Sequence, residues 1–167
     1  MKSLISRALS KNPEGLIQNI TPESAGWKFV GFDVFKLLSG KSLEKETHKK
    51  EVCLVILSGK ASVITKKKKW SQLGERESVF SRESGNKGIP PYAVYIPNED
   101  RFKVEALTDI ELAVCSAPGK GNYKASLLST PTLIKRGKDN NTRFINNIAM
   151  EIINENISIS NIPVLPI

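Results

Sequence analysis

The single histidine of this 167-residue chain, His48, is its most evident candidate metal ligand. It stands in a polar stretch with Glu44, Glu46 and Glu51, directly before the apolar run 52–57. A site for a divalent transition metal needs about three imidazoles and a carboxylate, because one neutral imidazole cannot hold the ion against water. We therefore expect His48 to be exposed or locally hydrogen-bonded. The three glutamates are expected to be solvated, since no partner pocket for a paired-acid site is evident.

A polar stretch near the C-terminal end is the second candidate for chemistry. Its guanidinium, ammonium and amide groups could form paired hydrogen bonds with the carboxylate and hydroxyls of a sugar acid. The same stretch could instead be a polar linker that ties two domains together. We assign no catalytic residue, and we take as candidate substrate or inter-domain contacts Arg136, Lys138, Asn140, Asn141 and Arg143.

Charge gives little support to a nucleic-acid partner. The formal net charge is +8, but a nucleic-acid surface gathers its cations on one face with aromatic residues between them. The lysines here are spread along the chain except for Lys66–Lys69, which lies between two strand-like stretches. We expect that run to be a solvated hairpin tip, with an anion-binding or RNA-binding patch as the alternative.

The two cysteines and the hydropathy of the chain indicate its compartment. Cys53 and Cys115 each lie within an apolar strand pattern, so we expect buried, reduced core thiols. No second histidine is present to serve either thiol as a base. No apolar run approaches the roughly 18 residues that span a bilayer, and the N-terminus lacks the apolar segment of a signal peptide. These features predict a cytoplasmic protein without a membrane partner.

The sequence pattern indicates short strands separated by turn residues, and these strands must position the candidate residues. Such a pattern predicts an all-β sandwich or small barrel. Edge strands are expected at 123–129 and 133–135, and the apolar spacing within 144–156 favours a helix. The other predicted strands are 27–38, 51–57, 61–65, 69–73, 78–80, 93–96, 101–107 and 110–116.

Two stretches follow the outline of the cupin motifs. Residues 40–60 run from a glycine through a polar stretch with His48 and Glu51 to an apolar strand and a glycine turn. The second motif has a proline, a glycine two residues later and then a histidine, and here Glu99 and Phe102 occupy the glycine and histidine positions. Phe102 cannot bind a metal and is expected in the core. We predict a single cupin-like (RmlC-like) β-barrel or jelly roll that holds no metal.

Several segments in the same order resemble the 5-deoxy-glucuronate isomerases of myo-inositol catabolism, within the bicupin uronate isomerases. The resemblance covers about residues 20–148. It is carried by 21–32, 50–60, 78–80, 90–97, 111–118 and 136–143.

The resemblance implies a domain organisation and a cofactor. Family members are similar to two fused cupin barrels, and the second barrel holds the catalytic divalent metal behind a Pro-Pro-His-x-His-like motif. No position of this chain matches that motif, so no ligand is carried over and no cofactor is expected in this chain. The implied domains are an N-terminal arm (1–19), a metal-free barrel (20–135) and a linker or truncated start of a second barrel (136–167).

The implied activity is aldose–ketose isomerisation of 5-deoxy-glucuronate to 5-dehydro-2-deoxy-gluconate. This chain is expected to be the inactive N-terminal half of such an enzyme, and its partner to be a second cupin barrel, on a separate chain or in lost sequence. The alternative is a stand-alone, metal-free cupin that binds a sugar acid as a sensor or storage module. A non-functional remnant and a homo-oligomer are also left open.

Overall fold

The computed structural model describes residues 7–9, 14–82, 88–120 and 123–128, and the backbone alone of 131–136 and 141–146. The chain divides into two compact units, Met1–Leu127 and Leu128–Ile167. The domain bounds expected from the sequence, 1–19, 20–135 and 136–167, stay a prediction. In the part of the chain that the structure describes, no helix is long and apolar enough to span a bilayer.

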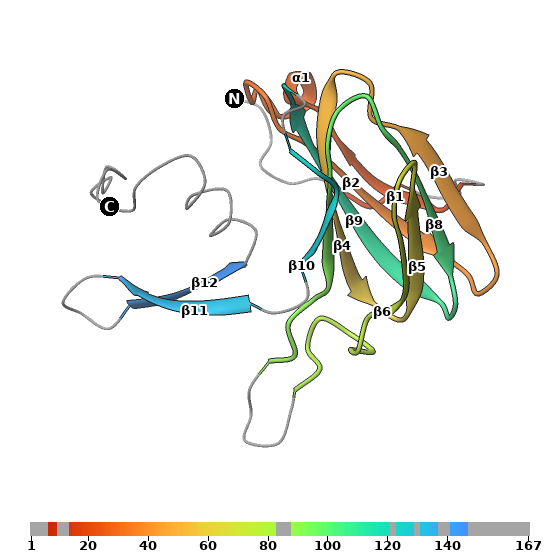
Figure 1. Ribbon diagram of the computed structural model, residues 1–167, viewed down its shortest axis with the longest axis vertical. Helices are drawn as coiled ribbons and strands as arrows, with labels where there is room; N and C mark the ends of the chain where they lie inside the picture. Colours follow the sequence, from red (N-terminus) through yellow and green to blue (C-terminus); the bar gives the residue numbers. More distant parts are fainter. Residues whose placement is uncertain are drawn as a thin grey trace. The chain divides into compact units, whose positions relative to one another are not determined.

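Two sheets form the larger unit (Figure 1). The six-stranded sheet has the order β1 (Leu16–Ile20), β2 (Gly31–Leu37), β9 (Ile110–Pro118), β4 (Lys50–Ser58), β7 (Ala93–Ile96) and β10 (Ser126–Leu128). The four-stranded sheet has the order β3 (Ser42–Glu46), β8 (Arg101–Ala106), β5 (Ala61–Thr65) and β6 (Lys69–Leu73). A short helix, α1 (Pro22–Ala25), joins β1 to β2, and the second unit contains the hairpin of β11 (Pro131–Arg136) and β12 (Asn141–Asn146).

The apolar side chains of both sheets meet in one core, because alternate residues of a strand point to opposite faces. The six-stranded sheet contributes Phe35, Leu54 and Leu112, and the four-stranded sheet contributes Val63 and Phe102. Each such fully buried side chain favours folding by about 1.5–3 kcal/mol relative to exposure. The fold is an all-β, cupin-like jelly roll, as the sequence predicts.

A tight turn between β4 and β5 connects the two sheets. Gly59 has a φ of 77°, and a Cβ at this position would lie 2.2 Å from the carbonyl oxygen of Asp109 in the β8–β9 turn. The same turn is held by hydrogen bonds from Gly59 N to Arg76 O (2.9 Å) and from Leu107 N to Lys60 O (2.9 Å). Only glycine combines this conformation with so close an approach.

Most predicted strands are confirmed, and three of them, at 61–65, 69–73 and 93–96, match in both bounds. The strand predicted at 27–38 begins only at Gly31, because a capped helical turn precedes it. Thr21 caps α1, Gly26 ends it in the left-handed conformation, and Trp27 N donates to Pro22 O (2.9 Å).

The strand predicted at 78–80 is wrong, because serine side chains satisfy its backbone locally. Ser78 N donates to Ser81 Oγ (3.0 Å) and Phe80 N donates to Ser78 Oγ (3.2 Å), which makes a turn. The helix expected at 144–156 is wrong where β12 covers it, to Asn146, and its remaining residues lie outside the described ones. The edge strand expected at 123–129 is confirmed in part by β10 at the end of its sheet.

Candidate functional site

His48 lies in the exposed turn between β3 and β4. Its side chain is 77% exposed, and its Nδ1 lies 3.7 Å from Oε2 of the exposed Glu46. Its φ of 48° is rare for a residue with a side chain. Of the two expectations from the sequence, an exposed or a locally hydrogen-bonded histidine, the exposed one is confirmed.

The neighbouring Thr47 explains where His48 lies. Thr47 is buried, and its N and Oγ1 both donate to Asp100 O (2.9 and 3.0 Å) while Asp100 N donates back to Thr47 Oγ1 (2.9 Å). Glu99 N donates to His48 O (2.7 Å). The two degenerate cupin motifs therefore do meet, through their turns, but they meet through backbone atoms and a threonine.

The residues present do not fit the divalent metal that the family resemblance implies. Phe102, at the position of the second-motif histidine, is 1% exposed and belongs to the packed core. Within the described ranges, no three His, Cys, Asp or Glu side chains come close enough to share an ion. The interior of this barrel is a hydrophobic core at the place where a metal site would need polar ligands.

The three glutamates near His48 do not converge on one site. Glu44 and Glu46 lie on β3 in the four-stranded sheet, whereas Glu51 lies on β4 in the other sheet. Glu51 accepts a hydrogen bond from the hydroxyl of Tyr95 (3.0 Å). Burial, and then this bond, raises the pKa of Tyr95 well above its usual value. The carboxylate and the phenol form a structural pair, not a paired-acid site.

The candidate contact residues near the C-terminal end fall where side chains are not described. In backbone register, Arg136 of β11 pairs with Asn141 of β12, and Ile134 pairs with Arg143. Lys138 and Asn140 lie outside the described residues. A ligand-contact role for Arg136, Lys138, Asn140, Asn141 and Arg143 stays a prediction.

A cavity of about 290 Å³ lies where three loops of the larger unit meet. The β5–β6 turn contributes Lys66, Lys67 and Lys68, and the segment before β10 contributes Lys124. Lys66 Nζ donates to the carbonyl oxygen of Glu99, which joins the β5–β6 and β7–β8 turns. The solvated hairpin tip expected at Lys66–Lys69 is confirmed, and it forms one wall of a cavity rich in lysine.

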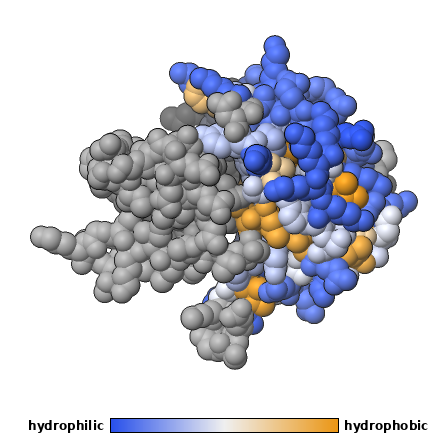
Figure 2. Space-filling view, in the orientation of Figure 1, coloured by the Kyte–Doolittle hydropathy of each residue, from blue (hydrophilic) through white to orange (hydrophobic). Residues whose placement is uncertain are grey.

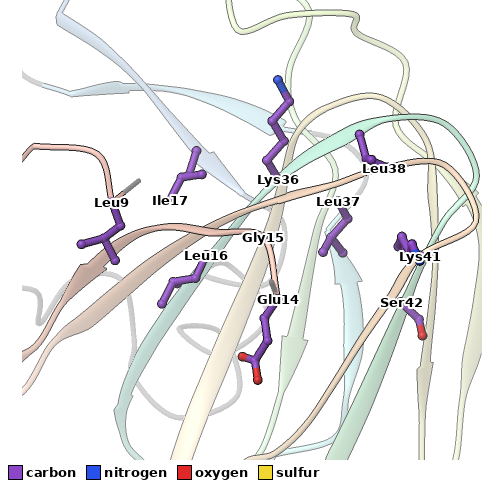
Figure 3. A pocket seen from close by; sticks show the side chains of 10 residues that line it. All are labelled: Leu9, Glu14, Gly15, Leu16, Ile17, Lys36, Leu37, Leu38, Lys41 and Ser42. Carbon is purple, nitrogen blue, oxygen red and sulfur yellow. The ribbon is translucent and has the colours of Figure 1, made fainter. Parts of the chain in front are cut away.

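A second cavity, of about 430 Å³, lies between the N-terminal segment and the β2–β3 turn (Figure 3). Half of its ten lining residues are aliphatic, among them Leu16 and Leu37. Lys36 and Glu14 extend in opposite directions, so their charges do not converge on one reacting group. On the face drawn in Figure 2, hydrophilic residues cover much of the described surface and hydrophobic residues form separate groups.

Comparison with known proteins identifies the lineage of this barrel. The family model described as "KduI/IolB family" matches residues 4–161. The chain belongs to the KduI/IolB family. Two curated relatives in this family are each named 5-deoxy-glucuronate isomerase. The protein of Geobacillus thermodenitrificans is 47% identical over 90% of this chain and 54% of its own length. The protein of Halalkalibacterium halodurans is 31% identical over 80% of this chain and 48% of its own length.

Solved structures agree with the KduI/IolB assignment. An IolB-like protein from Salmonella typhimurium LT2 is 41% identical, with a TM-score of 0.70, over 84% of this chain and 51% of its own. A structure of oxalate decarboxylase is 14% identical, with a TM-score of 0.50, over 71% of this chain and 29% of its own, and this shows the fold alone. The chain thus spans about half the length of the KduI/IolB relatives that it matches.

Proposed function

We propose that this chain supplies the metal-free barrel of a 5-deoxy-glucuronate isomerase. The carrying observation is the 47% identity to a relative of that name across 90% of this chain. The activity would belong to inositol catabolism, and we place it in the cytoplasm, where free thiols such as Cys53 and Cys115 stay reduced.

The chemistry explains why this barrel would need a partner. Aldose–ketose isomerisation moves a proton between neighbouring carbons, which requires a base positioned against the substrate. Among the described residues, His48 is exposed, Glu51 is engaged by Tyr95, and Phe102 fills the interior. We infer that the reacting groups come from the part of the relatives that this chain does not match. Arg136, Lys138, Asn140, Asn141 and Arg143 remain the proposed contacts to substrate or to that second barrel.

The experiment is a complementation assay. The chain is purified alone with added Mn²⁺, Zn²⁺ or Fe²⁺, and also co-expressed with the segment of the Geobacillus thermodenitrificans relative that it does not match. Isomerisation of 5-deoxy-glucuronate is then measured for both. We expect no turnover by the chain alone and turnover by the pair. Turnover by the metal-supplemented chain alone, or an inactive but stable pair, would contradict the proposal.

A second candidate function is favoured by the lysine-rich cavity. Lys66, Lys67, Lys68 and Lys124 line a space of about 290 Å³, where they outnumber the two acidic lining residues, Glu99 and Asp100. This volume is close to the lower limit for small-molecule sites. Ammonium groups around such a space attract a carboxylate. A stand-alone barrel that binds a sugar acid is therefore the alternative.

A further inference from the structure

The lysine-rich cavity of the larger unit combines positive charge with groups of other chemistry. Lys67 from the β5–β6 turn and Lys124 from the segment before β10 line it. In the described part of the chain, neither ammonium group lies within ion-pair distance of a carboxylate. Pro97, Asn98 and Tyr123 contribute apolar surface and an amide to the same lining. The lysines therefore remain available for an anion, and the other groups decide which anion fits.

The acidic residues of the lining are engaged mainly in holding the β7–β8 turn. Asp100 Oδ1 accepts hydrogen bonds from Lys66 N (3.1 Å) and Arg101 N (2.7 Å). Glu99 N donates to His48 O (2.7 Å), and Glu99 O accepts from Lys66 Nζ. Backbone N–H groups thus offset part of the Asp100 charge, and the Glu99 contacts are made by its backbone. The four lining lysines therefore keep an excess of positive charge over these two carboxylates.

Asn98 carries the feature of the cavity that the fold leaves unexplained. Among the described residues, its Oδ1 is the single buried side-chain nitrogen or oxygen without a hydrogen-bond partner. Such an atom costs free energy, so folded proteins keep few of them. The neighbouring Gly119, whose added Cβ would lie 3.4 Å from Asn98 Cβ, has no side chain to crowd the amide. Asn98 is thus an acceptor without a partner in the wall of a cationic cavity.

We propose that this cavity binds a hydroxylated carboxylic acid, whose hydroxyl Asn98 selects. Lys67 and Lys124 attract the carboxylate, and Asn98 Oδ1 accepts a hydrogen bond from the hydroxyl. To do so, the amide turns toward the cavity, which breaks no hydrogen bond to Oδ1. The free chain bears the cost of the unpaired acceptor, and only a ligand with a donor removes that cost.

This inference rests on the second candidate function, the sugar-acid binding module. It adds the residue that distinguishes a sugar acid from an aliphatic acid of the same charge, because lysine attracts both acids alike. Asn98 is therefore a specificity-determining residue of the cavity. The role of the barrel as the metal-free half of an isomerase does not depend on it.

The first test compares two ligands on the isolated chain. Calorimetry at about 0.15 M salt measures its affinities for sodium D-gluconate and sodium hexanoate. The two acids have the same carbon number and one carboxylate each, and they differ in their hydroxyl groups. We expect D-gluconate to bind at least about tenfold more tightly, because only its hydroxyl can pair with Asn98 Oδ1.

Three variants assign the preference to Asn98. Asn98→Leu removes the acceptor at similar volume, and it should weaken D-gluconate binding at least about fivefold without weakening hexanoate binding. Lys67→Ala should weaken both ligands equally, so that their affinity ratio stays that of wild type. Asn19→Leu is the matched control and should change neither affinity, because Asn19 is exposed and its Nδ2 donates to Asp33 Oδ1 (2.7 Å) outside the cavity.

Stability gives a readout that a structural role of Asn98 would move in the other direction. Replacing an unpaired buried acceptor by an apolar group removes its desolvation cost, so Asn98→Leu should unfold at a higher urea concentration than wild type. A lower midpoint, or a variant that does not fold, would show that the amide stabilises the fold. Either result would overturn its role as a ligand acceptor.

The binding results separate this inference from the function on which it rests. Equal affinity of the wild-type chain for both ligands, or an unchanged affinity ratio in folded Asn98→Leu, would overturn hydroxyl selection and leave the cavity as a general anion site. Absence of heat with both ligands would overturn hydroxyl selection together with the binding module.

Discussion

Cys53 and Cys115 show at the residue scale how position controls reactivity. They are register partners on β4 and β9, and both are free thiols. Burial, and then the neighbouring Cys115, raises the pKa of the Cys53 thiol from an ordinary value of 9.0 to about 11. Burial also raises the pKa of Cys115. The thiolate is the nucleophile, so both cysteines should be slow to react.

Alkylation by iodoacetamide at pH 8 tests this, with peptide mass spectrometry to follow Cys53 separately from Cys115. The rise from 9.0 to about 11 predicts about 100-fold slower reaction of Cys53 than in the unfolded chain. Because the folded pKa is the higher one, folding favours the protonated thiol. The associated stability is present below pH 9 and lost as the pH rises to about 11. If Cys53 is alkylated as fast in the folded chain as in denaturant, burial does not protect this thiol.

Residue-scale sequence reasoning predicted the exposed His48 and the buried Phe102, because one histidine cannot form a metal site and phenylalanine belongs in a core. It did not predict the bonds between Thr47 and Asp100, which are 53 residues apart. The unbroken apolar run of β4, in which Cys53 and Val55 alternate with core residues, shows that both faces of this strand are apolar.

At the scale of elements, the central strands could be predicted from the sequence because they are apolar at most positions. β3 was missed because Leu43 is its single fully buried apolar residue, and it is a strand through its pairing with β8. β1 was expected only as an N-terminal strand arm within 1–19, without strand bounds, because its burial depends on pairing with β2. Tertiary pairing decides such strands more than propensity does.

The β4–β5 turn permits a paired test of backbone geometry. Gly59 and Gly40 both have positive φ (77° and 79°), but a Cβ at Gly59 would meet Asp109 O at 2.2 Å, whereas nothing lies within 4 Å at Gly40. Gly40→Ala should cost about 1 kcal/mol of unfolding free energy from conformation alone. Gly59→Ala should cost at least about 2 kcal/mol more, because the backbone of the β8–β9 turn must move.

Urea unfolding followed by circular dichroism measures both variants. Equal losses of stability in Gly40→Ala and Gly59→Ala would show that the close approach to Asp109 is unimportant. A larger loss in Gly59→Ala, with an unchanged dependence on urea concentration, would place the effect in the folded state.

At the scale of the whole molecule, ligand binding by the isolated chain distinguishes the two proposed functions. The structural half of an isomerase needs no ligand of its own, whereas a sugar-acid binding module must bind without a partner. The net charge of +8 complicates this test, because a basic surface attracts any anion at low salt. The control must therefore change the net charge as much as the test variant does.

Lys67→Ala and Lys60→Ala form that pair, since each removes one exposed lysine and Lys67 alone lines the cavity. If the isolated chain is a binding module, calorimetry at 0.15 M salt should show binding of D-glucuronate but not of glucose. Lys67→Ala should then bind at least about fivefold more weakly, whereas Lys60→Ala should bind as wild type does, because screening limits the distant charge. If the wild-type chain gives no heat of binding with D-glucuronate, or if both variants bind it equally weakly, the hypothesis of a binding module is wrong. The structural half of an isomerase is then the proposed function of this barrel.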